Sequence, residues 1–311
     1  MSKKILLQKA TRIEGNADIH IEVENGTVKA ARFQVEDFRG FEKFSQGLRV
    51  EFIPHLVSRI CGLCSGAHQV ASIEAIEDGL GVDAPSSIKN LRQILVLGEW
   101  ISSHALSYFF LSMPDFVGAA GGVFELMDTH PEITGEAFSL RKSGQRIVEL
   151  LGKRAAHPVA LGVGRFLIAP TADELKEVRT ITLDVKERAA KLIGRMGKFN
   201  SGEKSIVLPP DQEVLFLTYD DRPGQDVFRA YSRDGEVVAR FSREGFEDHV
   251  SEMRAEWTFA KFPYLKSFGF PAGMVLVGPL SRSYQQGGFL DDPEIAKFEV
   301  ANQLRDRSSL G

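Results

Sequence analysis

The stretch VSRICGLCSGAHQVAS, residues 57–72, contains both cysteines of the chain, Cys61 and Cys64, and a histidine, His68. If a helix begins near Cys61, positions 61, 64 and 68 fall along one stripe of its surface. The N–H groups at the start of a helix favour the thiolate, the metal-binding and nucleophilic form of cysteine. The spacing alone leaves metal binding, redox chemistry and a chance pairing open. A thioredoxin-like site would need a βαβ pattern and a structural zinc site a second cysteine pair, and the sequence has neither.

The composition argues against several classes of protein. Lys and Arg number 38 against 42 Asp and Glu, so the net charge is −4 and indicates neither nucleic-acid nor membrane-surface binding. The N-terminal residues MSKKILLQKATRIEG lack the apolar run of a signal peptide, and two cysteines cannot form a disulfide framework. We therefore expect a cytoplasmic protein. The most apolar stretch, 94–113, is interrupted by Glu99 and His104, which favours a buried core helix over a membrane span.

Hydrophobic periodicity predicts an α+β fold that is mainly α, with a helical body and small β-hairpins near the two ends of the sequence. Residues 17–35 alternate about an Asn25-Gly26 turn, as in a hairpin. A strand over 213–220 precedes a second hairpin about Asp234-Gly235.

Helical patterns occupy most of the middle of the chain. The predicted starting segment of the last helix, Thr171 followed by Glu174, is a capping box. Apolar residues at heptad-like spacing, beginning with Leu175 and Val178, indicate that this helix packs in a bundle core. We predict one domain over 1–311, with helices over 66–79, 85–112, 131–154 and 171–197.

Four segments, in this order, resemble motifs of the nickel–iron hydrogenase large (alpha) subunit. The resemblance covers most of the chain and is closest to the cytoplasmic branch, of the viologen-reducing type that does not reduce deazaflavin. The segments are TRIEG (11–15), FRGFE (38–42), RICGLCSGAH (59–68) and SSHALSYFFLSMPDF (102–116).

The resemblance implies two metal sites. Cys61 would be a terminal thiolate on nickel, and Cys64 would bridge nickel and iron, for which soft thiolate ligands are suited. The iron would carry diatomic ligands. Glu42 would belong to a separate magnesium site, where a hard carboxylate oxygen is appropriate.

The resemblance also implies roles for three further side chains. Glu14 would take the proton when hydrogen is split. His68, one turn beyond Cys64, would donate a hydrogen bond to the bridging sulfur. Arg59 would donate to a carbonyl or sulfur near the site, or pair with an acid on the surface.

The sequence departs from the family pattern at several points. Asn16 replaces the histidine of TRIEGH, and Ser107 replaces the second histidine of SHxLH. The sequence has no third cysteine, so the D-P-C-x-x-C-x-x-H signature that supplies the other two thiolates is absent, as is the A-P-R-G run. Two thiolates cannot hold the nickel–iron centre. We therefore expect a C-terminally incomplete large subunit that is inactive by itself.

The expected function is the reversible heterolytic oxidation of H2, with protons as the second product and electrons passed to a partner. Two cysteines cannot supply the four thiolates of an iron–sulfur cluster, so those clusters would be carried by a small subunit, with further electron-transfer subunits beyond it. The alternative is a non-catalytic assembly or scaffold homologue that has lost the metal centre. Neither interpretation involves nucleic acid or a membrane.

Overall fold

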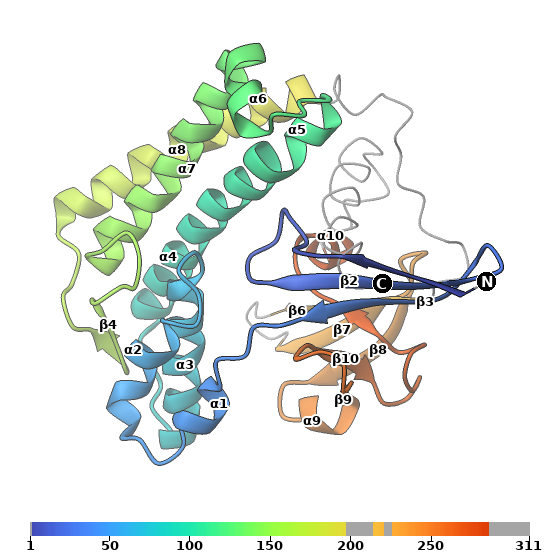
Figure 1. The fold of residues 1–311 in the computed structure, drawn as a ribbon. Helices are drawn as coiled ribbons and strands as arrows, with labels where there is room; N and C mark the ends of the chain where they lie inside the picture. Colours follow the sequence, from blue (N-terminus) through green and yellow to red (C-terminus); the bar gives the residue numbers. More distant parts are fainter. Residues whose placement is uncertain (1, 197–213, 221–225, 286–311) are drawn as a thin grey trace. The chain divides into compact units, whose positions relative to one another are not determined.

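The computed structural model describes residues 2–196, 214–220 and 226–285 (Figure 1). Residues 1–311, predicted as one domain, divide into two compact units. A strand-rich unit comprises Met1–Phe38 and Asn200–Gly311, and a helical unit comprises Arg39–Phe199. This division confirms the predicted fold class, a helical body with β structure contributed by the two ends of the sequence.

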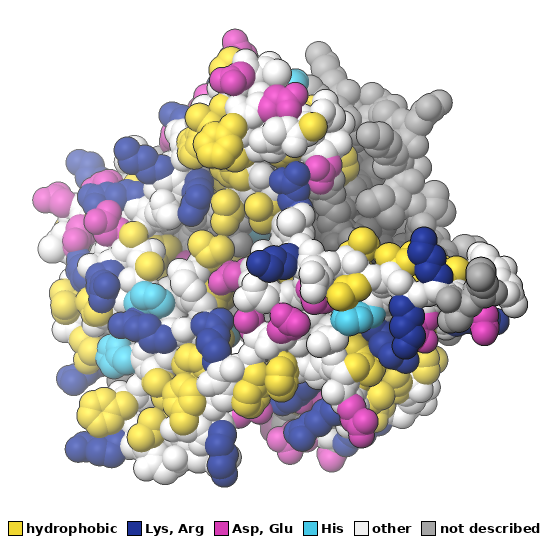
Figure 2. All heavy atoms as spheres, in the orientation of Figure 1, with side chains coloured by type: hydrophobic (Ala, Val, Ile, Leu, Met, Phe, Trp, Pro, Cys, Tyr) yellow, Lys and Arg dark blue, Asp and Glu magenta, His cyan; other side chains and the backbone are white. Residues whose placement is uncertain are grey.

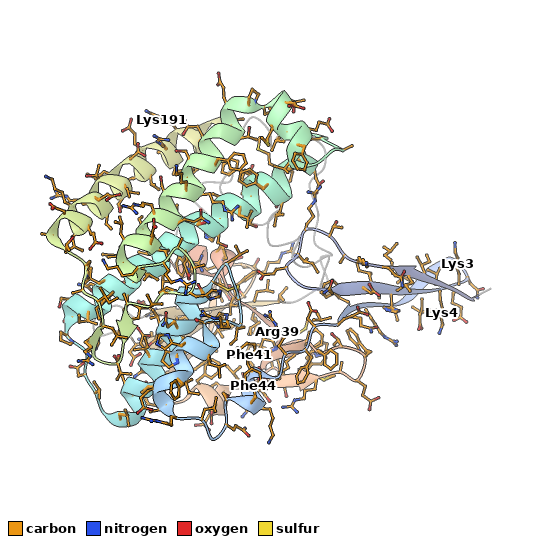
Figure 3. All side chains as sticks on the ribbon, turned by 60° about the vertical axis from the view of Figure 1, so that its left-hand side comes forward. Lys3, Lys4, Arg39, Phe41, Phe44 and Lys191 are labelled. Carbon is orange, nitrogen blue, oxygen red and sulfur yellow. A yellow bond between two sulfur atoms is a disulfide. The ribbon has the colours of Figure 1, made fainter. Side chains whose placement is uncertain are left out.

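The strand-rich unit begins with an antiparallel sheet of β1 (Ser2–Leu7), β2 (Ala17–Glu24) and β3 (Thr27–Val35). The predicted hairpin is β2–β3, and its turn places Asn25 at φ 50° and Gly26 at φ 79°. Both values suit the Asn-Gly pair of a tight hairpin turn. Strand β1 was not predicted. Figure 3 shows Lys3 and Lys4 projecting from opposite faces of β1, as alternation along a strand requires.

A second sheet of this unit has the strand order β11-β6-β7-β8, with β11 parallel to β6 and the other pairs antiparallel. The predicted strand is β6, and the predicted hairpin about Asp234-Gly235 is β7–β8. The elements are β6 (Leu215–Asp220), β7 (Val227–Tyr231), β8 (Val237–Ser242), α9 (Phe246–His249), β9 (Val250–Arg254), β10 (Lys261–Leu265), β11 (Val275–Leu276) and α10 (Pro279–Gln285).

The helical unit contains all four predicted helices, as α3, α4, α7 and α8. Beyond α4 the chain stays helical through a π-helix and α5, and turns follow over 117–122. The elements are α1 (Phe41–Phe44), η1 (Val50–Phe52), α2 (Ile53–Val57), α3 (Ser65–Leu80), α4 (Ser86–Ala105), η2 (Leu106–Ser112), α5 (Met113–Phe116), α6 (Val123–Thr129), α7 (Pro131–Gly152), β4 (Leu161–Gly162), β5 (Arg165–Phe166) and α8 (Ala172–Met196).

The predicted capping box opens α8. The backbone N–H of Thr171 donates to the Glu174 carboxylate at 2.7 Å, and the Glu174 N–H donates to the Thr171 hydroxyl at 3.2 Å. Val178 and Val185 are buried, as the heptad-like spacing predicts, whereas Leu175, in the first turn of the helix, is exposed. The predicted end at 197 lies just outside the described residues.

The long apolar helix packs against α7, as predicted for a core helix. Leu95 of α4 is fully buried beside Ile147 and Val148 of α7. A Cβ on Gly144 would lie 2.5 Å from the Gly98 carbonyl oxygen, so the two glycines allow α4 and α7 to approach closely. By length and composition alone, 86–116 could cross a membrane, but 39% of its most apolar window is buried within the fold.

A buried ion pair ties α3 and α4 to the β4–β5 turn. Arg92 is fully buried, and its guanidinium donates to both carboxylate oxygens of Glu77, at 2.9 and 2.7 Å. Arg92 also donates to the Gly162 carbonyl at 2.8 Å, and the Gly164 N–H donates to Glu77 at 2.6 Å. Burial alone would raise the pKa of Glu77, but the hydrogen bonds from Arg92 and Gly164 outweigh it and hold that pKa below its ordinary value.

Arg92→Leu is expected to lower the free energy of unfolding by about 3–5 kcal/mol, because it leaves the Glu77 charge buried and unpaired. Urea unfolding of the 311-residue chain measures the change. The matched control is Lys89→Ala, which removes a surface ion pair with Asp83 and should cost under about 1 kcal/mol. Since the folded pKa of Glu77 is depressed, the contribution of the Glu77–Arg92 pair should fade as the pH falls through that pKa. Equal decreases in the free energy of unfolding of Arg92→Leu and Lys89→Ala at neutral pH would contradict a stabilising role for the Glu77–Arg92 pair.

Exposed apolar side chains gather on the helical unit over α1 to α3 (Figure 2). Phe44, Phe52 and Leu80 are all exposed, and the Phe41 and Phe44 rings of α1 lie 4.8 Å apart (Figure 3). An apolar groove adjoins them, lined by Val50, Ile53, Ser72, Ala75, Ile76, Gly79 and Leu80. Exposed apolar side chains gathered beside a groove in this way are typical of a protein–protein contact.

Candidate metal centre

The two cysteines lie in the loop between α2 and α3, and not along one helix. Helix α2 ends at Val57 and α3 begins at Ser65, with Cys64 as its N-cap residue. The predicted stripe of 61, 64 and 68 is therefore wrong for Cys61, which precedes the helix. The loop nevertheless folds back so that the Cys64 N–H donates to Cys61 Sγ at 3.3 Å. The Cα atoms lie 5.5 Å apart and the sulfurs form a disulfide, the oxidised counterpart of a dithiolate pair.

A buried carboxylate from α4 caps the cysteine-bearing end of α3. Glu99 is only 6% exposed, and its oxygens accept the Gly66 N–H at 2.6 Å and the Ala67 N–H at 2.9 Å. The Ser65 hydroxyl donates to the same carboxylate at 3.4 Å. Burial raises the pKa of Glu99, against the opposing effect of these hydrogen bonds. Two of the N–H groups at the start of α3, of the kind expected to favour a thiolate, are thus already bonded to Glu99.

His157 joins both ends of the cysteine loop. Its backbone N–H donates to the Ser65 hydroxyl at 2.9 Å, and its ring Nδ1 lies 2.9 Å from the Ser58 carbonyl oxygen. Its φ is 53°, a left-handed conformation that is uncommon outside glycine. His157 therefore contacts Ser58, at the start of the cysteine loop, and Ser65, immediately after Cys64.

The two supporting residues of the predicted site both lie beside this loop. His68 is one turn into α3, where its N–H donates to the Cys64 carbonyl at 3.2 Å, and partial burial lowers its pKa. A lower pKa favours the neutral ring, which still has one N–H to donate. The Arg59 guanidinium donates to the Ser58 hydroxyl at 3.3 Å. The predicted roles of both residues toward the metal remain predictions.

The two predicted acids lie apart from the cysteine loop in the chain. Glu42 is exposed on α1, in the helical unit. Glu14 is exposed in the β1–β2 loop, in the strand-rich unit. Among the described residues, no group of three or more His, Cys, Asp or Glu side chains could hold a metal ion. The magnesium role of Glu42 and the proton-transfer role of Glu14 therefore remain predictions.

The loop that carries Glu14 is held by Asp37. The Asp37 carboxylate accepts the Asn16 N–H at 2.6 Å and the Asn16 side-chain amide at 3.1 Å. Gly15 has φ 92°, and a Cβ there would lie 2.7 Å from Asp37 Oδ2. The TRIEGN segment therefore needs glycine at 15, and Asn16, which departs from the family pattern, acquires a structural function.

The sulfur atoms of Cys61 and Cys64 are donors of the type that a nickel–iron centre requires. Two soft sulfur donors lie close enough to share one metal, as a terminal and a bridging thiolate must. They supply only part of a ligand set, and both must be reduced to bind. Glu99 and His157 were not identified from sequence as part of the site, because Glu99 is visible there only as an interruption of an apolar stretch. Their contacts to the loop join residues 33 and 99 positions apart, for which the sequence has no local signal.

Comparison with known proteins gives the family to which this chain belongs. Residues 39–134 match the family model described as nickel-dependent hydrogenase, and residues 4–38 match one described as HoxL-like. The boundary between the two matches coincides with the first boundary between the compact units. Two relatives and two solved structures extend the comparison to nearly the whole chain.

Two curated relatives are each at least 30% identical to this chain. One is the vhu A-subunit of the F420-non-reducing hydrogenase of Methanocaldococcus jannaschii, 33% identical over 290 residues, covering 89% of this chain and 69% of that protein. The other is the alpha-subunit of sulfhydrogenase 2 of Pyrococcus furiosus, 34% identical over 303 residues, covering 97% of this chain and 66% of that protein. The chain thus spans about two thirds of the length of these relatives.

The fold is likewise that of solved hydrogenases. An NAD+-reducing [NiFe]-hydrogenase in the H2-reduced state superposes with a TM-score of 0.76 at 23% identity, covering 97% of this chain and 75% of that chain. The reduced Ni-Fe-Se hydrogenase of D. vulgaris Hildenborough gives 0.68 at 22% identity, covering 92% and 67%. The matched family model and the relatives identify the chain as a homologue of nickel-dependent hydrogenase large subunits. The chain belongs to the nickel-dependent hydrogenase family.

Proposed function

We propose that this chain is the major part of the large subunit of a nickel–iron hydrogenase, which oxidises H2 reversibly to protons and electrons. One observation carries the proposal: in a chain of this family, the R-x-C-G-x-C segment brings Cys61 and Cys64 together at the start of α3. The other thiolates of a nickel–iron centre would come from outside the 311 residues, since the sequence contains no third cysteine.

Cys61 and Cys64, once reduced, would hold nickel and bridge it to iron. The centre, when bound, supplies the site at which H2 is split. His68 would donate to the bridging sulfur, and Arg59 would donate to acceptors at the edge of the loop. Lowering of the His68 pKa by burial supports its role, because a neutral ring adds no positive charge beside the thiolates.

Glu14 would take the proton released by heterolytic cleavage and pass it toward solvent. Its exposure and its place in the loop held by Asp37 support this role, because a proton carrier must reach water and keep a defined position. Glu42 would contribute a carboxylate oxygen to a magnesium site, for which exposed carboxylates are suitable.

We propose partners on two grounds. Both curated relatives are named as single subunits, alpha in P. furiosus and A in M. jannaschii, so each is one component of a larger enzyme. The exposed apolar side chains over α1 to α3 offer a surface for such a partner. The partner would be a small subunit that carries iron–sulfur clusters, and the complex would work in the cytoplasm. A non-catalytic scaffold is not favoured, because both relatives are named as hydrogenases.

H2-dependent reduction of a viologen dye tests the proposed activity. The complete hydrogenase containing this chain should be purified without oxygen, together with its partner subunits. We expect dye reduction under H2 and none under argon. A metal-loaded complex that reduces no dye under H2 would overturn the enzymatic proposal.

A further inference from the structure

Buried and partly buried hydrogen bonds hold the loop of residues 58–64 at both ends. We propose that Glu99 and His157 are positioning residues that fix Cys61 and Cys64 relative to each other. The two residues reach the loop from different parts of the chain, through Ser65 at its end and Ser58 at its start. That this positioning serves a metal centre rests on the function proposed above. The hydrogen bonds that fix the loop do not depend on that function.

Glu99 replaces the capping group that α3 lacks. Cys64, the N-cap residue, forms no side-chain cap, and sulfur is in any case a weak hydrogen-bond acceptor. The orphan N–H groups at the start of α3 are instead satisfied by the Glu99 carboxylate, at 2.6 Å from Gly66 N and 2.9 Å from Ala67 N. The Glu99 side chain is only 6% exposed. Loss of a hydrogen-bond partner by a buried ionisable group lowers the stability of the fold.

The packing around Gly66 shows that this contact is specific to its position. A Cβ on Gly66 would lie 2.5 Å from Leu95 Cδ2 and 2.9 Å from Glu99 Oε1. A larger residue at position 66 would have to displace the Leu95 or Glu99 side chain, so glycine there leaves room for the α4 carboxylate at the end of α3. Ser65 and Gly66, which follow Cys64 in the sequence, thus supply a hydroxyl that donates to Glu99 and the space for its carboxylate.

His157 extends the same network to the other end of the loop. Ser65 accepts the His157 N–H at 2.9 Å while donating to Glu99, and the His157 ring lies 2.9 Å from the Ser58 carbonyl oxygen. Movement of the Ser65 end would break its bonds to Glu99 and His157, and movement of the Ser58 end would break its bond to His157. Residues whose positions are fixed in this way hold a functional pair more tightly than the loop alone could.

The equilibrium between the Cys61–Cys64 disulfide and glutathione measures how well the loop holds the sulfurs together. Two glutathione molecules reduce the disulfide, giving two protein thiols and one glutathione disulfide. The full 311-residue chain without metal is titrated in glutathione redox buffers at pH 6, where ordinary thiols, with a pKa of about 8.5, are protonated. We expect Glu99→Gln and Ser65→Ala to shift this equilibrium about tenfold toward the dithiol, because each weakens bonds that hold one loop end.

Glu77→Gln is the matched control. Glu77 is as buried as Glu99 and also accepts a backbone N–H, but it lies toward the other end of α3. The Glu77→Gln variant should have a lower free energy of unfolding in urea but the same glutathione equilibrium as the wild type. If Glu99→Gln does not fold, Ser65→Ala decides the question. An unchanged equilibrium in the folded variants, or an equal shift in Glu77→Gln, would overturn the proposal. Because no nickel is involved, a failed hydrogenase assay would leave this result standing.

Discussion

Nickel is expected to be lost from the complete hydrogenase when Cys61 or Cys64 is replaced by serine. Mutation of groups that merely orient a metal ligand typically costs about 10–100-fold in metal affinity, so removal of a thiolate ligand should cost more. Hydrogen oxidation should fall with the nickel. The helical unit should still fold, since its buried core around Leu95 and Ile147 does not include either cysteine. Nickel analysis by mass spectrometry and circular dichroism of the same samples provide the two readouts.

Leu63→Ala is the control for this prediction. Leu63 lies between the two cysteines and is exposed, so its replacement disturbs the loop sequence without removing a sulfur donor. It should retain nickel. Wild-type nickel content in either serine variant would contradict the ligand assignment, and loss of nickel in Leu63→Ala would attribute the effect to the loop fold instead.

Glu14→Gln is expected to preserve metal content while slowing H/D exchange by about 10²–10⁴-fold, the usual contribution of a positioned acid or base. Glutamine keeps the size of the side chain but cannot carry the proton. Isotope exchange between H2 and deuterated water is the readout, because it reports proton delivery separately from electron flow to the partner.

Glu24→Gln serves as the matched control, since Glu24 is an exposed acid at the far end of β2 in the same unit. It should exchange at the wild-type rate. An unaltered exchange rate in Glu14→Gln would leave Glu14 with a structural function only, and loss of metal in that variant would also contradict the proposed role.

The features that could be predicted from the sequence are those with local signals. The Asn25-Gly26 turn needs φ > 0 at both positions, and few residue pairs other than Asn-Gly adopt that conformation easily. The Thr171–Glu174 capping box is likewise contained within four consecutive residues. The cysteine pair could be located because its motif is short and specific.

The remaining features depend on contacts between distant parts of the chain. Strand β1 has little alternation of its own and is defined by pairing with β2. A helix that begins near Cys61 starts too early, because the capping carboxylate of α3 comes from Glu99, on another helix. The capping role of Glu99 can be recognised only from the packing of α4 on α3. The same holds for His157, which reaches Ser58 across 99 positions.

X-ray absorption at the nickel edge of the complete hydrogenase, purified without oxygen, tests the central claim most directly. The account predicts stoichiometric nickel in a shell of sulfur neighbours, with iron at bridging distance, and fewer sulfur neighbours in any nickel that Cys64→Ser retains. Zinc at the cysteine pair, a pair that remains oxidised in the active enzyme, or nickel coordinated only by nitrogen and oxygen would contradict it.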